Sequence, residues 1–173
     1  MAHRLALSAN IEDYVWAHTR QSDIAARLQA ETAAMPQAGM QIGPDQAAFL
    51  ALLVRSIGAQ RCIEVGTFTG YSALAVAGAL PEGGKLVCCD INAEWTAIAR
   101  RYWDEAGVSA RIELRLAPAL DTLNTLLSRD GAAHCNPRLR ALADEDAEAR
   151  CGCVPCFELF CRFRLQSANS DFG

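Results

Sequence analysis

Apolar residues recur at helical spacing in the first third of the chain, and they predict three helices. Two of these lie within residues 8–34, and the second ends at Met35, because a residue that precedes a proline is displaced from the helical region. The third begins at Pro44, a residue type that the first turn of a helix tolerates, and ends at Gly58. Apolar side chains cover most of the circumference of this third helix, so we expect it to be buried.

A different pattern, a short apolar strand followed by a turn and a helix, occurs three times between residues 61 and 127. The predicted strands are residues 61–65, 85–89 and 111–116. The helices that follow them are predicted to run to Leu80, Ala106 and about residue 127. Strands that alternate with helices in this way favour right-handed crossovers and a parallel sheet. We therefore predict a doubly wound α/β fold for residues 40–127, incomplete because open sheets usually contain more than three strands.

The periodic pattern ends after residue 128. The residues that follow contain an acidic cluster between Asp144 and Glu148 and then an apolar run crowded with cysteine. The sequence therefore predicts three parts. They are an N-terminal helical segment (1–39), the α/β domain (40–127) and an irregular Cys-rich C-terminal tail (128–173), for which disorder is one alternative.

Composition and charge exclude several classes of protein. Of the 173 residues 51% are hydrophobic and 21% are charged, which rules out wholesale disorder and a collagen-like fibre. The net charge of −4 gives no reason to expect a nucleic acid or an anionic membrane as the partner. The longest apolar stretch, from Ala47 to Val54, is too short to cross a bilayer, and the N-terminus lacks the apolar region of a signal peptide. We therefore expect a soluble cytoplasmic protein.

The residues best suited to bind a ligand lie around the first predicted strand, in the segment from Ile63 to Ser72. Gly66 allows a sharp turn at the end of the strand, and Gly70 allows a ligand or a helix to approach the backbone. The turn presents backbone N–H groups at a helix N-terminus, where a carboxylate or a phosphate is favoured. The spacing of the glycines is G-x-x-x-G, so the dinucleotide motif G-x-G-x-x-G is absent.

Two acids near this turn narrow the class of ligand. Asp90 ends the second predicted strand, 24 residues beyond Gly66, where an acid can accept both hydroxyls of a ribose. Glu64 lies within the first strand, and its carboxylate would repel a ligand that presents only phosphates. A ligand with a cationic end removes this conflict, and S-adenosylmethionine (SAM) combines a sulfonium, an ammonium group and a ribose.

The segment from Ile63 to Ser72 resembles the cofactor motif of the cation-dependent O-methyltransferases, the family of the caffeoyl-CoA and catechol O-methyltransferases. Residues 38–46, 58–61 and 116–120 also resemble parts of this family. As a set, these segments extend the resemblance over about residues 8–127. The resemblance implies a Rossmann-like class I methyltransferase fold. It also implies a SAM-dependent enzyme that transfers a methyl group to a hydroxyl of a small catechol- or phenol-like acceptor.

Carried over position by position, the resemblance implies a cofactor site that consists of seven residues. They are Ile42, Glu64, Gly66, Thr67, Ser72, Asp90 and Ala119. Glu64 and Ser72 would hold the methionine end of SAM. Asp90 would bind the ribose, and Ala119 would lie beside the adenine. The resemblance also implies a homodimer, because members of the family are commonly dimers.

The family uses a divalent cation such as Mg²⁺, which lowers the pKa of a phenolic hydroxyl from roughly 10. Its ligands in the family include an aspartate that follows a fourth strand. The corresponding stretch here, residues 141–147, has no hydrophobic strand before it, so no metal ligand and no catalytic residue is assigned. The alternative interpretation is a chain truncated or frame-shifted after about residue 127. Such a chain would be an inactive remnant or a cofactor-binding module.

Two further groups of residues have a competing interpretation. Four thiolates can bind zinc tetrahedrally, so the cysteines of the tail are an alternative zinc site within such a module. These cysteines are Cys151, Cys153, Cys156 and Cys161. Three aromatic residues recur at helical spacing beyond the second strand, and we expect them to serve in packing rather than to form an aromatic cage. They are Trp95, Tyr102 and Trp103.

Overall fold

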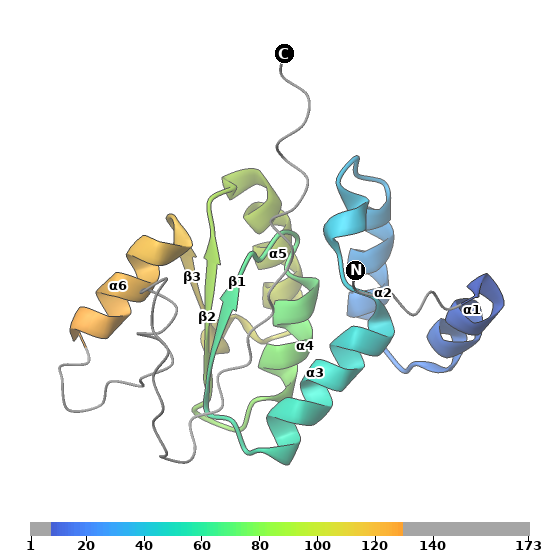
Figure 1. Ribbon diagram of the computed structural model, residues 1–173, viewed down its shortest axis with the longest axis horizontal. Coiled ribbons are helices and arrows are strands. Elements are labelled where there is room, and N and C mark those ends of the chain that lie inside the picture. The colour runs from blue at the N-terminus through green and yellow to red at the C-terminus, as the bar shows by residue number, and fades with distance from the viewer. Residues whose placement is uncertain (1–7, 130–173) are drawn as a thin grey trace, which may run out of the picture.

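A parallel three-stranded sheet forms the centre of the structure, and helices lie on both of its sides (Figure 1). The computed structural model describes residues 8–129. Its strands are β1 (Arg61–Val65), β2 (Lys85–Asp90) and β3 (Ile112–Leu116), in the spatial order β1-β2-β3. Ile63 of β1 pairs with Val87 of β2, which pairs in turn with Glu113 of β3. The predicted fold, with three parallel strands and flanking helices, is confirmed for the described residues.

The helices within residues 8–129 follow the order that the sequence predicts. They are α1 (Ala9–His18), α2 (Asp23–Ala33), α3 (Pro44–Ser56), α4 (Tyr71–Ala79), α5 (Ala93–Glu105) and α6 (Ala119–Arg129), with short 3₁₀ turns η1 (Ala38–Met40) and η2 (Ser109–Arg111). Two of the helices begin at an N-cap residue whose side chain accepts a hydrogen bond from the first turn. The Ser22 hydroxyl accepts a hydrogen bond from the amide of Ala25 at 3.2 Å. The Asn92 side chain accepts one from the amide of Trp95 at 3.0 Å.

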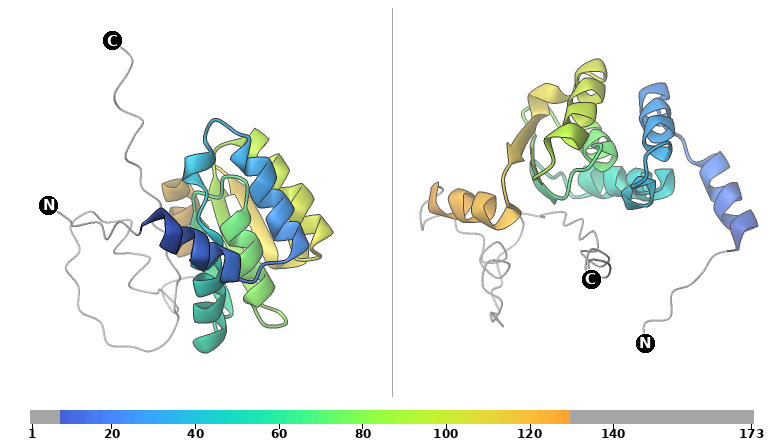
Figure 2. Two further views of the ribbon diagram at one scale, coloured as in Figure 1. Left: turned by 90° about the vertical axis from the view of Figure 1, so that its right-hand side faces the viewer. Right: turned by 90° about the horizontal axis from the view of Figure 1, so that it is seen from above.

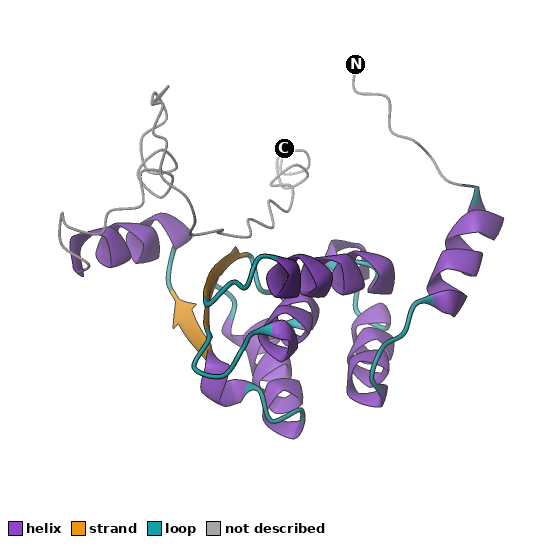
Figure 3. Ribbon diagram, turned by 90° about the horizontal axis from the view of Figure 1, so that it is seen from below, coloured by secondary structure: helices purple, strands orange, loops and turns teal. Residues whose placement is uncertain are grey.

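The helices α3, α4 and α5 lie on the side of the sheet that faces most of the core (Figure 1). Cys62 and Leu86 contribute buried side chains from the strands. Helix α4 is almost wholly apolar, and its Ala73 and Ala77 are fully buried, because small side chains allow the helix to lie close to its neighbours. Helix α6 lies on the other side of the strands (Figure 3). The sheet is therefore the middle layer of the described fold.

Helix α3 differs from the prediction that it is buried on most sides. Its buried apolar residues Ala47, Leu50 and Val54 form one stripe, which packs against α4. Phe49 and Leu52 lie on the opposite side and are 56% and 57% exposed. The prediction was wrong because an apolar residue shows only that a position tolerates burial, whereas the number of neighbouring elements decides how many sides are covered.

Helix α2 packs against α4 and α5, and its Leu28 and Thr32 are completely buried. An ion pair between Arg27 and Glu105 also joins α2 to α5 on the surface. Helix α1 lies at the edge of the molecule, where it contacts α3 (Figure 2). Helix α2 therefore covers the outer side of the helices that follow β1 and β2 (Figure 1).

No helix within residues 8–129 is both long enough and apolar enough to cross a membrane. The acidic cluster and the cysteines predicted to characterise the tail lie outside the described residues.

Candidate ligand-binding site

The loop between β1 and α4, residues 66–70, contains three residues in the left-handed backbone region. They are Gly66 (φ +84°), Phe68 (φ +51°) and Gly70 (φ +80°). At Gly70 the surroundings exclude a side chain as well, because a Cβ would lie 2.6 Å from the Cβ of Ala99 and 2.8 Å from the ring of Trp103. The sequence left open whether a ligand or a helix approaches Gly70, and the structure places helix α5 there.

Asp90, at the end of β2, holds this loop in place. Its Oδ2 accepts hydrogen bonds from the backbone amides of Thr67 and Phe68, each at 2.8 Å. Its Oδ1 accepts one from the amide of Asn92 at 2.8 Å. The sequence predicts that the amides of this turn bind a carboxylate or a phosphate, and two of them bind the protein's own carboxylate. A carboxylate has about four acceptor positions, so Asp90 keeps about one for a ligand.

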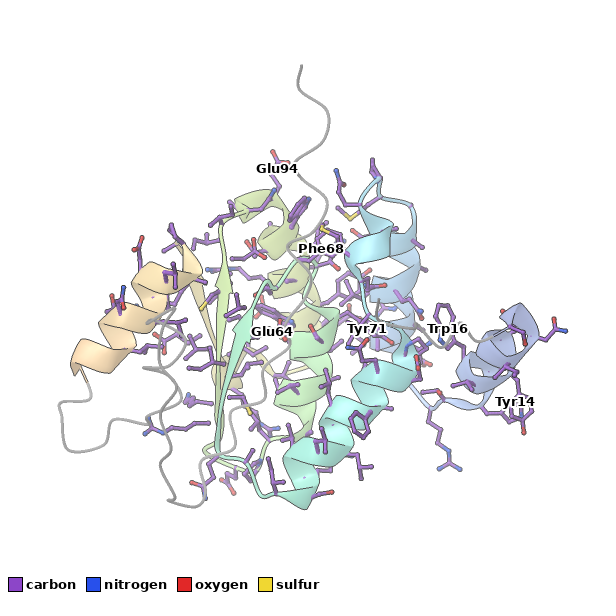
Figure 4. The ribbon with its side chains drawn as sticks, viewed as in Figure 1. Tyr14, Trp16, Glu64, Phe68, Tyr71 and Glu94 are labelled. Atoms are coloured by element: carbon purple, nitrogen blue, oxygen red, sulfur yellow. The ribbon has the colours of Figure 1, made fainter. Side chains whose placement is uncertain are left out.

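Glu64 is a buried acid of β1, two residues before this loop, and its side chain lies between the strand and α4 (Figure 4). It is only 3% exposed, and its Oε1 has no hydrogen-bond partner among the described residues. Burial raises the pKa of the carboxyl to about 8, the Ser72 hydroxyl opposes this rise, and the charge of Asp90 adds to it. Leaving a buried polar atom unpaired costs about 1–3 kcal/mol, so Glu64 is suited to a ligand that brings a donor or a positive charge.

A cavity of about 210 Å³ opens beside the loop, at the carboxyl ends of β1 and β2. It is lined by Met40, Gln41, Ile42, Gly66, Thr67, Phe68, Thr69, Tyr71, Ser72, Asp90 and Trp95. Five of the seven predicted site residues are among them, and Glu64 lies in the strand that leads into the loop. Ala119, at the start of α6, is not. The volume is below the roughly 300–1,000 Å³ of complete small-molecule sites, so the cavity accommodates part of a larger ligand.

Several residues of this cavity wall were not predicted from the sequence, most clearly the aromatic pair of Phe68 and Trp95. Their rings meet edge to face, with 5.0 Å between the centroids and 85° between the planes. All three aromatic residues were predicted to serve in packing. Tyr102 and Trp103 pack in the core, whereas Trp95 packs on Phe68 at the cavity wall. The Asn92 cap could have indicated this position, because it places Trp95 in the first turn of α5, near the end of β2.

The cysteines of the strands do not contribute reactive groups to the site. Cys62, Cys88 and Cys89 are buried free thiols, and burial raises the pKa of each, that of Cys62 to about 11. Residues 8–129 also contain no group of three or more His, Cys, Asp or Glu side chains arranged to hold a metal ion.

Comparison with known proteins places this site in a family. A family model described as O-methyltransferase matches residues 16–141, beyond residue 127, where the sequence motifs predicted that the resemblance ends. Catechol O-methyltransferase domain-containing protein 1 of Mus musculus is 46% identical over 101 residues, 58% of this chain and 38% of that protein. Caffeoyl-CoA O-methyltransferase 2 of Petunia hybrida is 37% identical over 117 residues, 68% of this chain and 48% of that protein. The chain thus spans less than half the length of these two relatives.

Solved structures agree with this assignment. An O-methyltransferase from Bacillus cereus, in complex with SAH, superposes with a TM-score of 0.63 at 30% identity, over 68% of this chain and 54% of that chain. The O-methyltransferase TomG from Streptomyces achromogenes, in complex with SAM, gives a TM-score of 0.63 at 30% identity, over 72% and 56% of the two chains. Because the family model also matches well over half of the sequence, the chain belongs to the O-methyltransferase family.

Proposed function

We propose that this chain binds SAM and functions as an O-methyltransferase that methylates a hydroxyl of a small catechol- or phenol-like acceptor. The observation that carries the proposal is the buried carboxyl of Glu64, whose Oε1 is unpaired among the described residues, beside a cavity lined by Ser72 and Asp90. The names of the relatives, which include caffeoyl-CoA and catechol O-methyltransferases, support the class of acceptor.

The residues present fit the charges and shape of SAM. The ammonium group of its methionine end would supply the partner that Glu64 Oε1 lacks. The acceptor position left on Asp90 suits a ribose hydroxyl. Ile42 offers an apolar wall to the same cavity. The small cavity volume agrees with a site for the methionine and ribose parts, and Ala119, proposed to lie beside the adenine, is outside it.

When bound, SAM supplies an electrophilic methyl group. The part proposed for this chain is to orient that group, because a displacement requires the attacking oxygen, the methyl carbon and the sulfur to lie in line. A divalent cation such as Mg²⁺ is proposed from the family resemblance alone. We assign it no ligand within residues 8–129, and residues 141–147 lie outside the described residues.

Titration calorimetry of the full chain with S-adenosylhomocysteine tests the donor site. We expect a dissociation constant on the order of micromolar, and a weakening of roughly 30-fold or more in Glu64→Ala, because removal of one member of a buried ion pair leaves the other unpaired. Asp90→Ala should abolish measurable binding, because it removes both the acceptor for the ribose and the anchor of the loop amides. Glu94→Ala is the matched control, since Glu94 is an exposed acid in the first turn of α5 (Figure 4) and should bind as the wild type does.

No binding by wild-type protein that circular dichroism shows to be folded would contradict the proposal. A methyl-transfer assay with SAM, Mg²⁺ and catechol then separates the two interpretations of the sequence. Methylated product supports the enzyme, whereas binding without product supports the alternative of a cofactor-binding module. The zinc-binding tail of that alternative lies outside the described residues.

We also propose a cytoplasmic location and a homodimer. The three buried free thiols, at Cys62, Cys88 and Cys89, support a reducing compartment. The exposed side chains of Phe49 and Leu52 on α3 support an interface, because large apolar residues on one helix face favour association. Cell fractionation and light scattering test the two proposals.

A further inference from the structure

The loop that lines the cavity is anchored from three separate elements. Asp90 of β2 holds the amides of Thr67 and Phe68. The indole Nε1 of Trp103, on α5, donates to the carbonyl of Gly70 at 3.0 Å. The remaining anchor is at Thr69, and it comes from α2, more than 30 residues earlier in the chain.

This anchor is a directed chain of hydrogen bonds in a fully buried site. The hydroxyl of Thr32 lies 2.8 Å from the carbonyl of Leu28 and 2.9 Å from the hydroxyl of Thr69, and both threonines are 0% exposed. A carbonyl can only accept, so the single proton of Thr32 goes to Leu28, and the Thr69 hydroxyl donates to Thr32. The Gln41 amide donates to Thr69 at 3.5 Å. Thr69 therefore connects α2 with another residue of the cavity wall.

A second contact ties the N-terminal part of the chain to the same region. The hydroxyl of Tyr71, the first residue of α4, donates to Oε1 of Gln21 at 2.7 Å. The loop itself needs such support, because Phe68 adopts a left-handed conformation that residues with a Cβ disfavour. Without its anchors the loop would populate other conformations. The apparent affinity for a ligand would then fall in proportion to the fraction of molecules whose loop remains in the binding conformation.

We propose that Thr32 is a positioning residue of the binding site, which holds the loop in its binding conformation through the hydroxyl of Thr69. The α2 helix is in this view a part of the binding site rather than only a cover for α4 and α5. The inference depends on the proposed function only for the identity of the ligand.

The test compares two substitutions at Thr32 with one at a matched position in the full chain. Thr32→Val keeps the shape and removes the hydroxyl, and Thr32→Ser restores it. Thr122→Val is the control, because Thr122 is 6% exposed, hydrogen-bonds Cys89 on the α6 side of the sheet and does not line the cavity. The measurements are hydrogen–deuterium exchange of residues 66–72 in ligand-free protein and the dissociation constant for S-adenosylhomocysteine.

We expect faster exchange of the loop and about fivefold weaker binding in Thr32→Val, a change that corresponds to the loss of one hydrogen bond. Thr32→Ser and Thr122→Val should resemble the wild type in both measurements. This holds for Thr122→Val even if it lowers the melting temperature as much as Thr32→Val does. Thr69→Val breaks the same hydrogen bond by removing its other partner, the hydroxyl of Thr69 in the loop. If the bond carries the effect, the double variant should bind no more weakly than Thr69→Val alone.

Equal loop exchange in Thr32→Val and Thr122→Val would overturn the inference, as would additive effects in the double variant. If Thr32→Val does not fold, the exchange rate in Thr69→Val, compared with that in Thr122→Val, decides the same question. A wild-type chain that binds no S-adenosylhomocysteine would contradict the proposed function, and the exchange measurement would still decide the role of Thr32.

Discussion

The buried carboxyl of Glu64 should make the stability of the ligand-free protein fall as the pH rises. The perturbation is Glu64→Gln, which keeps the shape of the side chain and removes its titration. Burial raises the pKa of Glu64 from an ordinary value of 4.5 to about 8, so the folded state holds a proton that the unfolded state has released. The stabilising contribution of this proton is complete below pH 4.5 and is lost as the pH rises toward 8.

The size of the effect follows from this difference in bound protons. Between pH 5 and pH 7 the folded protein binds nearly one proton more at Glu64, and each pH unit then costs ~1.4 kcal/mol. The free energy of unfolding should therefore decrease by roughly 2–3 kcal/mol more in the wild type than in Glu64→Gln over this range. Glu31, whose pKa is lowered by its hydrogen bond from Tyr102, has the opposite dependence, but it is present in both proteins and cancels.

Urea unfolding, followed by circular dichroism at pH 5, 6 and 7, measures this difference. Only the pH dependence is compared between the variants, because the glutamine amide changes the absolute stability as well. Glu94→Gln, a substitution of an exposed acid, should keep the slope of the wild type. Equal slopes in the wild type and Glu64→Gln would refute the reasoning, since they would mean that Glu64 is already ionised in the folded, ligand-free state.

Three further predictions use the same site. If the proposed ligand binds, its ammonium group should displace the proton of Glu64, so binding at pH 7 should release about one proton. This release is measured as a dependence of the calorimetric binding enthalpy on the buffer. Glu64→Gln should show no such dependence. Gly70→Ala should destabilise the protein by about 1–3 kcal/mol more than Gly83→Ala. Both glycines have positive φ, but of the two only Gly70 has neighbours with which a Cβ would collide. Equal melting temperatures of the two variants would contradict this. Trp103→Phe should cost roughly 0.5–1.5 kcal/mol in urea unfolding, since it removes one of two donors to the Gly70 carbonyl and leaves the Leu74 amide as the other. An unchanged midpoint would show that the bond from Trp103 is dispensable.

Much of the fold was predictable because its signals are local. A short apolar run followed by a glycine turn and a helix identifies each strand without reference to the rest of the chain, and the three predicted strands form. Helix caps are local signals of the same kind, since the Ser22 hydroxyl caps α2 from the position directly before the helix. The exposed face of α3 was not predictable, because Phe49 and Leu52 are as apolar as the residues that the helix buries.

The candidate site was predictable to the extent that its residues lie at the ends of parallel strands. Such strands bring their carboxyl ends to one edge of the sheet, so Gly66 and Asp90 had to lie close together. The direction of the Asp90 side chain was a different matter. The sequence suggested a ligand for the amides of the turn, and the structure shows that Asp90 itself takes two of them.

The sequence by itself determined the order of strands and helices, the glycine turn and the family to which its motifs point. Each of these depends on residues close together in the chain, or on spacing that a parallel sheet converts into proximity. Only the tertiary structure decided that Thr32 meets Thr69, that Trp95 lines the cavity and that Glu64 is buried with its Oε1 unpaired among the described residues. These contacts join segments that are far apart in the sequence, and no local pattern of residues indicates them. They form only when the helices pack on the sheet.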